Sequence, residues 1–258
     1  MKIYICTDLE GISGIDCMEM ISTDDTRYRF SIERLMTDVN AAVDGAFAGG
    51  ATHVTVFDGH ASGKNFDISL LDKRAELETR GNKKWWGKLD DTYSGTYVIG
   101  AHAMAGTING FLDHTQSSRT WFNYWVNGRR IGELAQWAMV AGHFNVPVLM
   151  VSGDEAACFE AQQFFNPLEY AVVKRGLGRN RALLVNPDEA VERIREAARK
   201  AVALAGKGKP FKPILPMELK LELYRSDFCD EVANNPGVER LDARTVRKVS
   251  NSCLDLFF

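Results

Sequence analysis

The stretch KIYICTDLEGISG, residues 2–14, joins a short apolar segment to two carboxylates and two glycines. KIYIC has the length and apolar character of a buried strand, and Asp8 and Glu10 follow it directly. A carboxylate next to a buried strand costs free energy unless a partner or a cation compensates its charge. The stretch therefore predicts a first strand whose carboxyl end carries a polar site.

Similar apolar segments recur along the chain and alternate with helical patterns. THVTVF at 52–57 and TYVIGAHA at 96–103 are the next predicted strands, and apolar residues in helical steps fill 27–48 between the first two. Strand and helix alternation of this kind is typical of an α/β fold. We expect a mainly parallel layered sheet flanked by helices. The Asn127-Gly128 dipeptide adds a predicted β-hairpin at 121–131, as an embellishment of that sheet.

The pattern also divides the chain into two predicted parts. The α/β domain is expected to span 1–208, because Gly206 and Gly208 end a long helix that starts after Asn186. The remaining residues, 209–258, contain several prolines and the segment MELKLELY, in which apolar and charged residues alternate. We expect them to form a smaller α+β region packed on the first.

Composition and charge exclude several classes of partner. The net charge is −3, the isoelectric point is near 6.0, and no run of Lys and Arg stands out, so neither nucleic acid nor a membrane surface is an expected partner. No apolar stretch approaches the roughly 18 residues of a spanning helix, and Asp8 and Glu10 interrupt the N-terminal apolar run too early for a secretory signal. The 5 cysteines are scattered and form no C-x-x-C pair, which favours free thiols in the cytoplasm.

Polar side chains follow each of the first three predicted strands. Asp8 and Glu10 end the first strand, His60 follows the second and His102 the third, with His114 farther along. The carboxyl ends of parallel strands meet at one edge of a sheet, so these side chains are expected to converge. Carboxylates mixed with imidazoles are typical ligands of zinc or manganese, and two acids able to bridge indicate two ions.

The segment ELAQWAMVAGHF at 133–144 adds another candidate ligand. It has hardly any polar face, which predicts a helix that is buried on most sides. Glu133 lies in its first turn, where an exposed carboxylate gains about 0.3–1 kcal/mol from the helix dipole. A buried Glu133 would instead need a cation, which a metal would supply.

Each candidate also has a simpler explanation. Asp8 and Glu10 could form a solvated strand end, and a single histidine is more often structural than catalytic. His53 lies in the middle of a strand and His143 at a helix end, so both are interpreted as structural. The case for a metal site therefore depends on several candidates falling together at strand and helix ends.

Five segments carry a resemblance to a known family. They are TDLEGISG (7–14), DGHASGKN (58–65), IGAHAMAG (99–106), HTQSS (114–118) and GRRIGELAQWAMVAGHFNVPVLMVSGD (128–154). In their order and spacing they resemble the DppA-type D-aminopeptidases, a family of zinc metallopeptidases. The similarity continues through 172–202, so it covers nearly the whole chain.

The resemblance implies a site, a substrate and an assembly. It implies two zinc ions per subunit, hydrolysis of N-terminal residues, D-amino acids by preference, from short peptides, and a homo-oligomer in the form of a decamer around a central channel. By the same resemblance the catalytic residue is His114 and the zinc ligands are Asp8, Glu10, His60, His102 and Glu133. Asp113, directly before His114, departs from the family pattern, so the sequence leaves the charge around His114 open.

These observations lead to a hypothesis of metal-assisted peptide hydrolysis. Asp8 is the expected bridging ligand because it is the shorter acid at the strand end. His114 could act as a general acid or base, stabilise an oxyanion, or act as a nucleophile. The alternatives are another dinuclear hydrolase of esters, amides or phosphates, and a non-catalytic metal-binding assembly protein. The segment GISG lacks the spacing of a dinucleotide loop, and no G-x-S-x-G elbow lies near His114.

Overall fold

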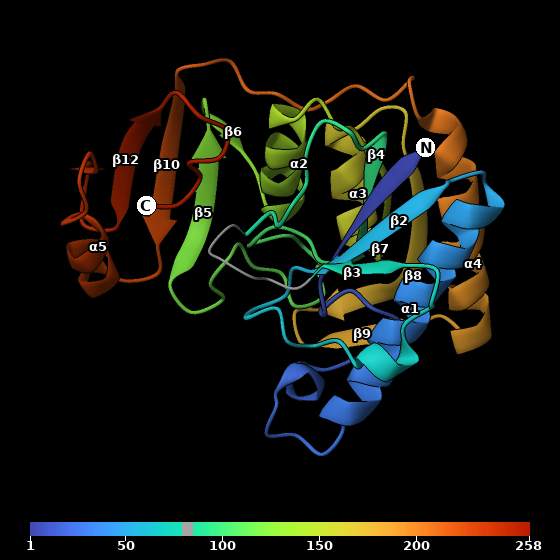
Figure 1. Ribbon diagram of the computed structural model, residues 1–258. Coiled ribbons are helices and arrows are strands. Elements are labelled where there is room, and N and C mark those ends of the chain that lie inside the picture. The colour runs from blue at the N-terminus through green and yellow to red at the C-terminus, as the bar shows by residue number, and fades with distance from the viewer. Residues whose placement is uncertain (79–84) are drawn as a thin grey trace.

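The fold is built on a twisted sheet, sheet A, that is parallel except at one edge (Figure 1). The computed structural model describes residues 1–78 and 85–258. Over these residues sheet A has 7 strands, in the spatial order β3 (Glu76–Glu78), β2 (His53–Asp58), β1 (Lys2–Thr7), β4 (Gly95–Ala101), β7 (Val148–Asp154), β8 (Glu169–Gly178) and β9 (Arg181–Leu184). Among the described strands of sheet A, only β9 runs antiparallel to its neighbour. The predicted α/β class with a mainly parallel sheet is confirmed.

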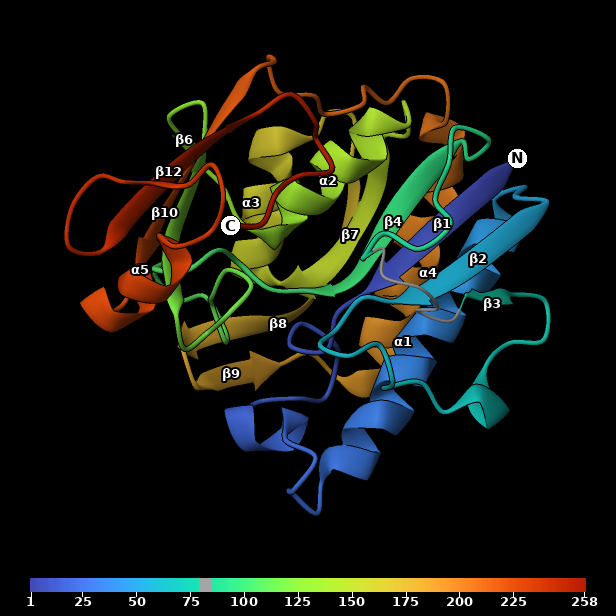
Figure 2. The ribbon, with the colours of Figure 1, turned by 60° about the vertical axis from the view of Figure 1, so that its left-hand side comes forward.

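Alternate residues of the strands of sheet A point to two helical layers. In β1, Ile3 and Ile5 pack into the core beneath α1 (Tyr28–Ala48) and α4 (Pro187–Ala201), while Tyr4 and Cys6 face the opposite core. Figure 2 shows α1 and α4 together on one face of the sheet, with α2 (Glu133–His143) and α3 (Glu155–Phe164) on the other. Because both faces of the sheet are covered, the central strands β1, β4 and β7 are buried along nearly their whole length.

A second, antiparallel sheet lies beyond α2 and covers its far side (Figure 1). This sheet B has 5 strands among the described residues, in the order β11 (Glu239–Arg240), β12 (Thr245–Ser250), β10 (Met217–Leu223), β5 (Trp121–Val126) and β6 (Arg129–Arg130). Leu134 and Trp137 of α2 pack against sheet A, whereas Ala135 and Met139 pack against sheet B. Helix α2 is thus enclosed by two sheets, which accounts for its lack of a polar face.

The predicted hairpin forms, but its place differs from the expectation. Asn127 and Gly128 both have positive φ, as a two-residue hairpin turn requires. Instead of embellishing sheet A, β5 pairs with β10, so the hairpin and the C-terminal region form one sheet. Apolar periodicity reports which face of a strand is buried but not which distant strand pairs with it. The division of the chain at residue 208 stays a prediction.

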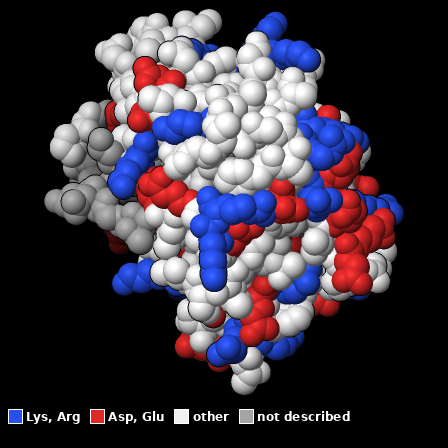
Figure 3. Space-filling model, turned by 45° about the vertical axis from the view of Figure 1, so that its right-hand side comes forward, with Lys and Arg blue, Asp and Glu red and all other residues white. Residues whose placement is uncertain are grey.

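The remaining elements are short and lie at the periphery. They are the 3-10 turns η1 (Met18–Ile21), η2 (Ile68–Leu70) and η3 (Val202–Leu204), and the helix α5 (Ser226–Val232). On the face seen in Figure 3, Lys and Arg side chains alternate with Asp and Glu side chains. Within the described ranges no helix is long and apolar enough to cross a bilayer.

Candidate metal centre

Adjacent strands of sheet A bring the first four predicted site residues together. Strands β2, β1 and β4 are parallel neighbours. Asp8 and Glu10 follow the end of β1, His60 follows β2 and His102 follows β4. The convergence expected from the sequence is therefore found at the carboxyl edge of the sheet.

One cluster of possible ligands joins the ends of β1 and β2. The Nδ1 atom of His60 lies 2.9 Å from Oδ1 of Asp8 and 3.1 Å from Oε2 of Glu10. These three side chains each offer one ligand atom within 4.8 Å of the others. They could hold a single cation between them.

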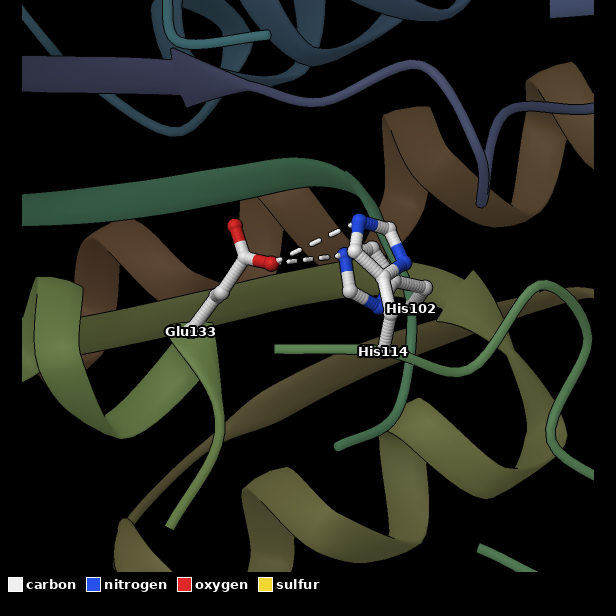
Figure 4. Close-up of side chains that lie close together, drawn as sticks. All are labelled: His102, His114 and Glu133. Carbon is white, nitrogen blue, oxygen red and sulfur yellow. Dashed lines mark ion pairs between the residues drawn. The ribbon is translucent and has the colours of Figure 1, made fainter. Parts of the chain in front are cut away.

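A second cluster lies beside the first and includes the start of α2. Figure 4 shows His102 and His114 with their rings side by side, each directing a nitrogen at the same carboxylate of Glu133. Nε2 of His102 lies 3.3 Å from Oε1 of Glu133, and Nε2 of His114 lies 3.7 Å from the same oxygen. The two imidazole rings are stacked, with their centroids 4.0 Å apart. This cluster also has three potential ligand atoms within 4.8 Å of one another.

Asp8 links the two clusters. Its Oδ1 atom faces His60, while its Oδ2 atom lies 3.3 Å from Nε2 of His102. Oε1 of Glu10 also reaches to 4.0 Å from Nε2 of His114. Asp8 and Glu10 thus each direct their two oxygens at different clusters, but Asp8 makes the shorter contacts, at 2.9 and 3.3 Å, and is the better placed of the two for a bridging ligand.

The acids and histidines of the two clusters shift one another's pKa values. Burial and the nearby Glu10 carboxylate raise the pKa of Asp8 to about 7. Burial also works to raise the pKa of Glu133, but the neighbouring His102 outweighs it and holds that pKa below its ordinary value. Burial would lower the pKa of His60, yet the acids around it, Glu10 first, raise it well above its usual range. The centre thus favours added positive charge.

The tautomers of His102 and His114 also favour a bound cation. Nδ1 of His102 donates to the carbonyl of Ala103 at 3.0 Å, and Nδ1 of His114 donates to the carbonyl of Leu112 at 2.7 Å. In a neutral imidazole the other nitrogen, Nε2, then carries a lone pair, and here it faces carboxylate oxygens. Nε2 of His102 is buried without a hydrogen-bond partner among the described residues. Lone pairs and anions that converge in this way fit divalent cations bound between them.

Several residues that the sequence did not single out hold this centre in place. The backbone N–H of Gln116 donates to Oε1 of Glu133 at 2.7 Å. The Lys174 ammonium, fully buried in β8, donates to the carbonyls of Glu10 and Ile15, at 2.8 Å each. A lysine within the apolar run AVVKRG is a signal that could have identified Lys174. Nothing in the sequence distinguishes Gln116.

A glycine shapes the loop that carries Glu10. The N–H of Gly11 donates to the carbonyl of Gly100 at 2.8 Å, so the loop passes directly over the end of β4. A Cβ atom on Gly11 would lie 1.9 Å from the carbonyl oxygen of Ala101. Only glycine permits this close approach.

The Asp113 carboxylate is bound within its own loop. Its carboxylate accepts a hydrogen bond of 2.6 Å from the N–H of Gly106 and lies 3.7 Å from Nε of Arg179. The charges that act on His114 come from His102, Glu133 and Glu10. Asp113 therefore stabilises its own loop, because its side chain turns to the backbone at Gly106.

The other two histidines lie away from the centre. His53 begins β2, at the end of the strand opposite His60, and its Nε2 lies 3.1 Å from Glu76. His143 ends α2, a helix length from Glu133. Neither belongs to the two metal-ligand groups found among the described residues.

The two clusters open into one cavity of about 390 Å³. Its apolar wall includes Val98, Leu134 and Trp137, and the segment after His114 supplies another wall with Gln116 to Arg119. A mostly apolar cleft with a few convergent polar groups is the usual form of a small-ligand site.

Comparison with known proteins gives matches over nearly the whole chain. The family model described as D-aminopeptidase, M55, matches residues 1–258. A D-aminopeptidase of Bacillus subtilis (strain 168) is 32% identical over 242 residues, which cover 93% of this chain and 87% of the relative. The structure titled as the Zn-dependent D-aminopeptidase DppA from Bacillus subtilis, a self-compartmentalizing protease, aligns with a TM-score of 0.94 at 29% identity, over 99% of this chain and 93% of that one. The chain therefore belongs to the M55 family of D-aminopeptidases.

Proposed function

We propose that this chain is a dinuclear zinc aminopeptidase that removes N-terminal residues, D-amino acids above all, from short peptides. The observation that carries the proposal is the sharing of Asp8 between two ligand clusters inside one cavity. The zinc dependence stated for the related DppA supports zinc as the metal. Nitrogen and carboxylate oxygen donors suit that ion.

The proposed ligands divide into two sets that have Asp8 in common. Glu10 and His60 complete the first set, and His102 and Glu133 complete the second. Bound zinc would supply Lewis-acid chemistry, polarising a carbonyl and lowering the pKa of a water from ~15.7 toward ~7. The carboxylates of Asp8, Glu10 and Glu133 would compensate the charge of the ions.

His114 is the proposed catalytic residue beside these ligands. Burial lowers the pKa of His114, so its imidazole is neutral at neutral pH. The hydrogen bond from Nδ1 to Leu112 leaves Nε2 free to accept a proton. A neutral base of this kind can take a proton from the attacking water and return it to the leaving amine.

The His114→Ala variant tests that role. We expect zinc content to stay at the wild-type level while kcat falls by about 10²–10⁴-fold, the usual contribution of a general acid or base. Metal analysis and steady-state kinetics on the same preparation measure both quantities. His143→Ala, at the exposed far end of α2, is the control and should leave both unchanged. Lost zinc in His114→Ala would make His114 a ligand, and wild-type activity would remove it from the mechanism.

The proposed function as a whole is tested by metal analysis with a panel of D- and L-alanyl p-nitroanilides and dipeptides. We expect two zinc ions per chain, hydrolysis that a chelator abolishes and zinc restores, and faster release of D- than of L-alanine. One ion per chain would contradict the dinuclear centre, and a preference for L-alanine would contradict the stereochemical part. Absence of chelator-sensitive hydrolysis from every substrate would favour a non-catalytic metal-binding protein.

We also propose that the chain forms a homo-oligomer, a decamer, in the cytoplasm. The description of the related DppA as self-compartmentalizing supports an assembly. The described residues form no disulfide, which suits a reducing compartment; their cysteines are Cys6, Cys17, Cys158, Cys229 and Cys253. Native mass spectrometry would give the number of subunits, and any number other than ten would contradict the decamer.

A further inference from the structure

Arg119 is the only lysine or arginine among the described residues that line the cavity. The acids of that cavity, Asp8, Glu10 and Glu133, all belong to the metal clusters. Arg119 lies on the wall formed by the segment after His114, next to Ser118. Among the described residues, the cavity therefore combines a candidate metal centre with one separate cationic side chain, that of the exposed Arg119.

No acid of the described residues neutralises this arginine. Neither a hydrogen bond nor an ion pair joins the Arg119 side chain to any of them, whereas Arg74 pairs with Asp72 at 2.6 Å and Arg193 with Glu189 at 2.6 Å. An unpaired arginine on a convex surface is simply solvated. An unpaired arginine on the wall of a concave site leaves its donors available for a ligand.

The backbone that carries Arg119 is fixed to the metal centre. Gln116 donates through its N–H to Glu133 and through Nε2 to Oε1 of the fully buried Gln136, both at 2.7 Å. The N–H of Thr120 donates to Oγ of Ser117 at 3.1 Å, and β5 begins at the next residue. Arg119 thus extends from a short turn that is anchored on both sides, so its base has a defined position relative to Glu133.

This placement suits a ligand with charges of opposite sign at its two ends. Resting on the proposed function, the metal centre takes the free amine and the scissile carbonyl of a peptide. An extended chain spans at most ~3.3–3.6 Å per residue, so the α-carboxylate of a dipeptide or tripeptide lies within roughly 7–11 Å of its amine. Arginine matches a carboxylate with two parallel N–H donors.

We propose that Arg119 binds the α-carboxylate of short peptide substrates. The site then selects peptides whose free C-terminus lies one or two residues beyond the scissile bond. Longer peptides and C-terminal amides lack a carboxylate at that position and are poorer substrates. The apolar side chains of Val98, Leu134 and Trp137 line the same cavity.

The test compares D-alanyl-D-alanine with its C-terminal amide. In the wild type we expect kcat/KM to be at least about 10-fold higher for the free acid. In Arg119→Gln this ratio should fall toward one through a higher KM for the acid, a loss of about 10–100-fold for a charge-assisted pair. Arg119→Lys, which keeps the charge but not the fork, should give an intermediate ratio. Arg29→Gln, an exposed arginine of α1, is the matched control and should keep the wild-type ratio.

Zinc content is measured on every variant, so that a loss of metal can be distinguished from a loss of carboxylate binding. A wild type that cleaves both substrates equally well, with chelator sensitivity, overturns the role of Arg119 and leaves the aminopeptidase function intact. An Arg119→Gln variant that loses activity equally on both substrates also overturns it. A wild type that cleaves neither substrate, nor any other of the alanyl panel, overturns the proposed function and the role of Arg119 with it.

Discussion

At the scale of single residues, Glu160 is a buried acid behind the loop that carries His102. Its Oε2 atom accepts a hydrogen bond of 2.7 Å from the N–H of Met104, and its Oε1 atom is buried without a hydrogen-bond partner among the described residues. Burial raises its pKa to about 7 from an ordinary 4.5. The folded protein therefore holds Glu160 in its protonated form in mildly acidic solution.

This raised pKa makes stability depend on pH with a definite sign. The folded state binds the Glu160 proton more tightly than the unfolded state does. The stabilisation that this protonation gives the folded state is therefore complete below pH 4.5 and is lost as the pH rises through about 7. Between these values Glu160 lowers the free energy of unfolding by at most about 1.4 kcal/mol per pH unit. Glu160→Gln, which resembles the protonated form, should remove this slope.

Urea unfolding of chelator-treated protein at about pH 5 and about pH 8 measures the effect. The stability of Glu160→Gln relative to wild type should increase with pH. Glu155→Gln, in the same helix but with a half-exposed side chain, is the control and should track the wild type. A constant difference between Glu160→Gln and wild type would show that Glu160 is ionised in the folded protein throughout.

At the scale of elements, the start of α2 has little room for change. Gly132 precedes Glu133, and a Cβ atom on it would lie 2.7 Å from Cβ of Met104 and 2.8 Å from Oε1 of Glu160. The loop after β4 and helix α3 therefore meet the first turn of α2 at this glycine. The position of Glu133 in the metal centre depends on this contact.

Gly132→Ala should displace that turn and weaken zinc binding. Overpacking of this kind costs about 1–3 kcal/mol, and the displacement moves Glu133 relative to His102. The matched control is Gly128→Ala in the exposed hairpin turn, where nothing lies within 4 Å but φ is +78°. That variant should lose about 1 kcal/mol through backbone strain and keep its zinc affinity. Thermal unfolding and zinc titration distinguish the two, and equal zinc affinities would refute the role of Gly132.

At the scale of the whole molecule, a buried lysine connects distant parts of the chain. Lys174 in β8 reaches the loop after β1, although β4 and β7 lie between these strands in sheet A. Its ammonium lies 4.5 Å from the ring centroid of Phe111, and burial lowers its pKa to about 7. The loop that carries Glu10 is thus fixed from the other half of the sheet.

Lys174→Met should therefore affect both stability and the metal centre. The carbonyls of Glu10 and Ile15 would lose their donor, at a cost of about 1–3 kcal/mol for each unsatisfied group. We expect weaker zinc binding in addition, because the loop of Glu10 is released. Lys200→Met, an exposed lysine of α4, should change stability by less than about 0.5 kcal/mol and leave zinc affinity unchanged. A Lys174→Met variant with wild-type zinc affinity would contradict this account of the loop.

Local pattern was enough to determine a large part of this protein. Strands, helices and their order follow from side-chain periodicity and from end signals such as Asn186, whose side chain accepts from the N–H groups of Asp188 and Glu189 at the start of α4. The convergence of Asp8, Glu10, His60 and His102 was predictable too, because parallel strands present their carboxyl ends at one edge.

Only the tertiary structure decided what depends on contacts between distant segments. The pairing of β5 with β10, the enclosure of α2 by two sheets and the reach of Lys174 to Glu10 join residues far apart in the chain. Periodicity carries no information about which of several apolar faces pack together, since any of them would bury similar area. The direction of a side chain such as Asp113, which turns to Gly106 and away from His114, is fixed by the packed loops around it.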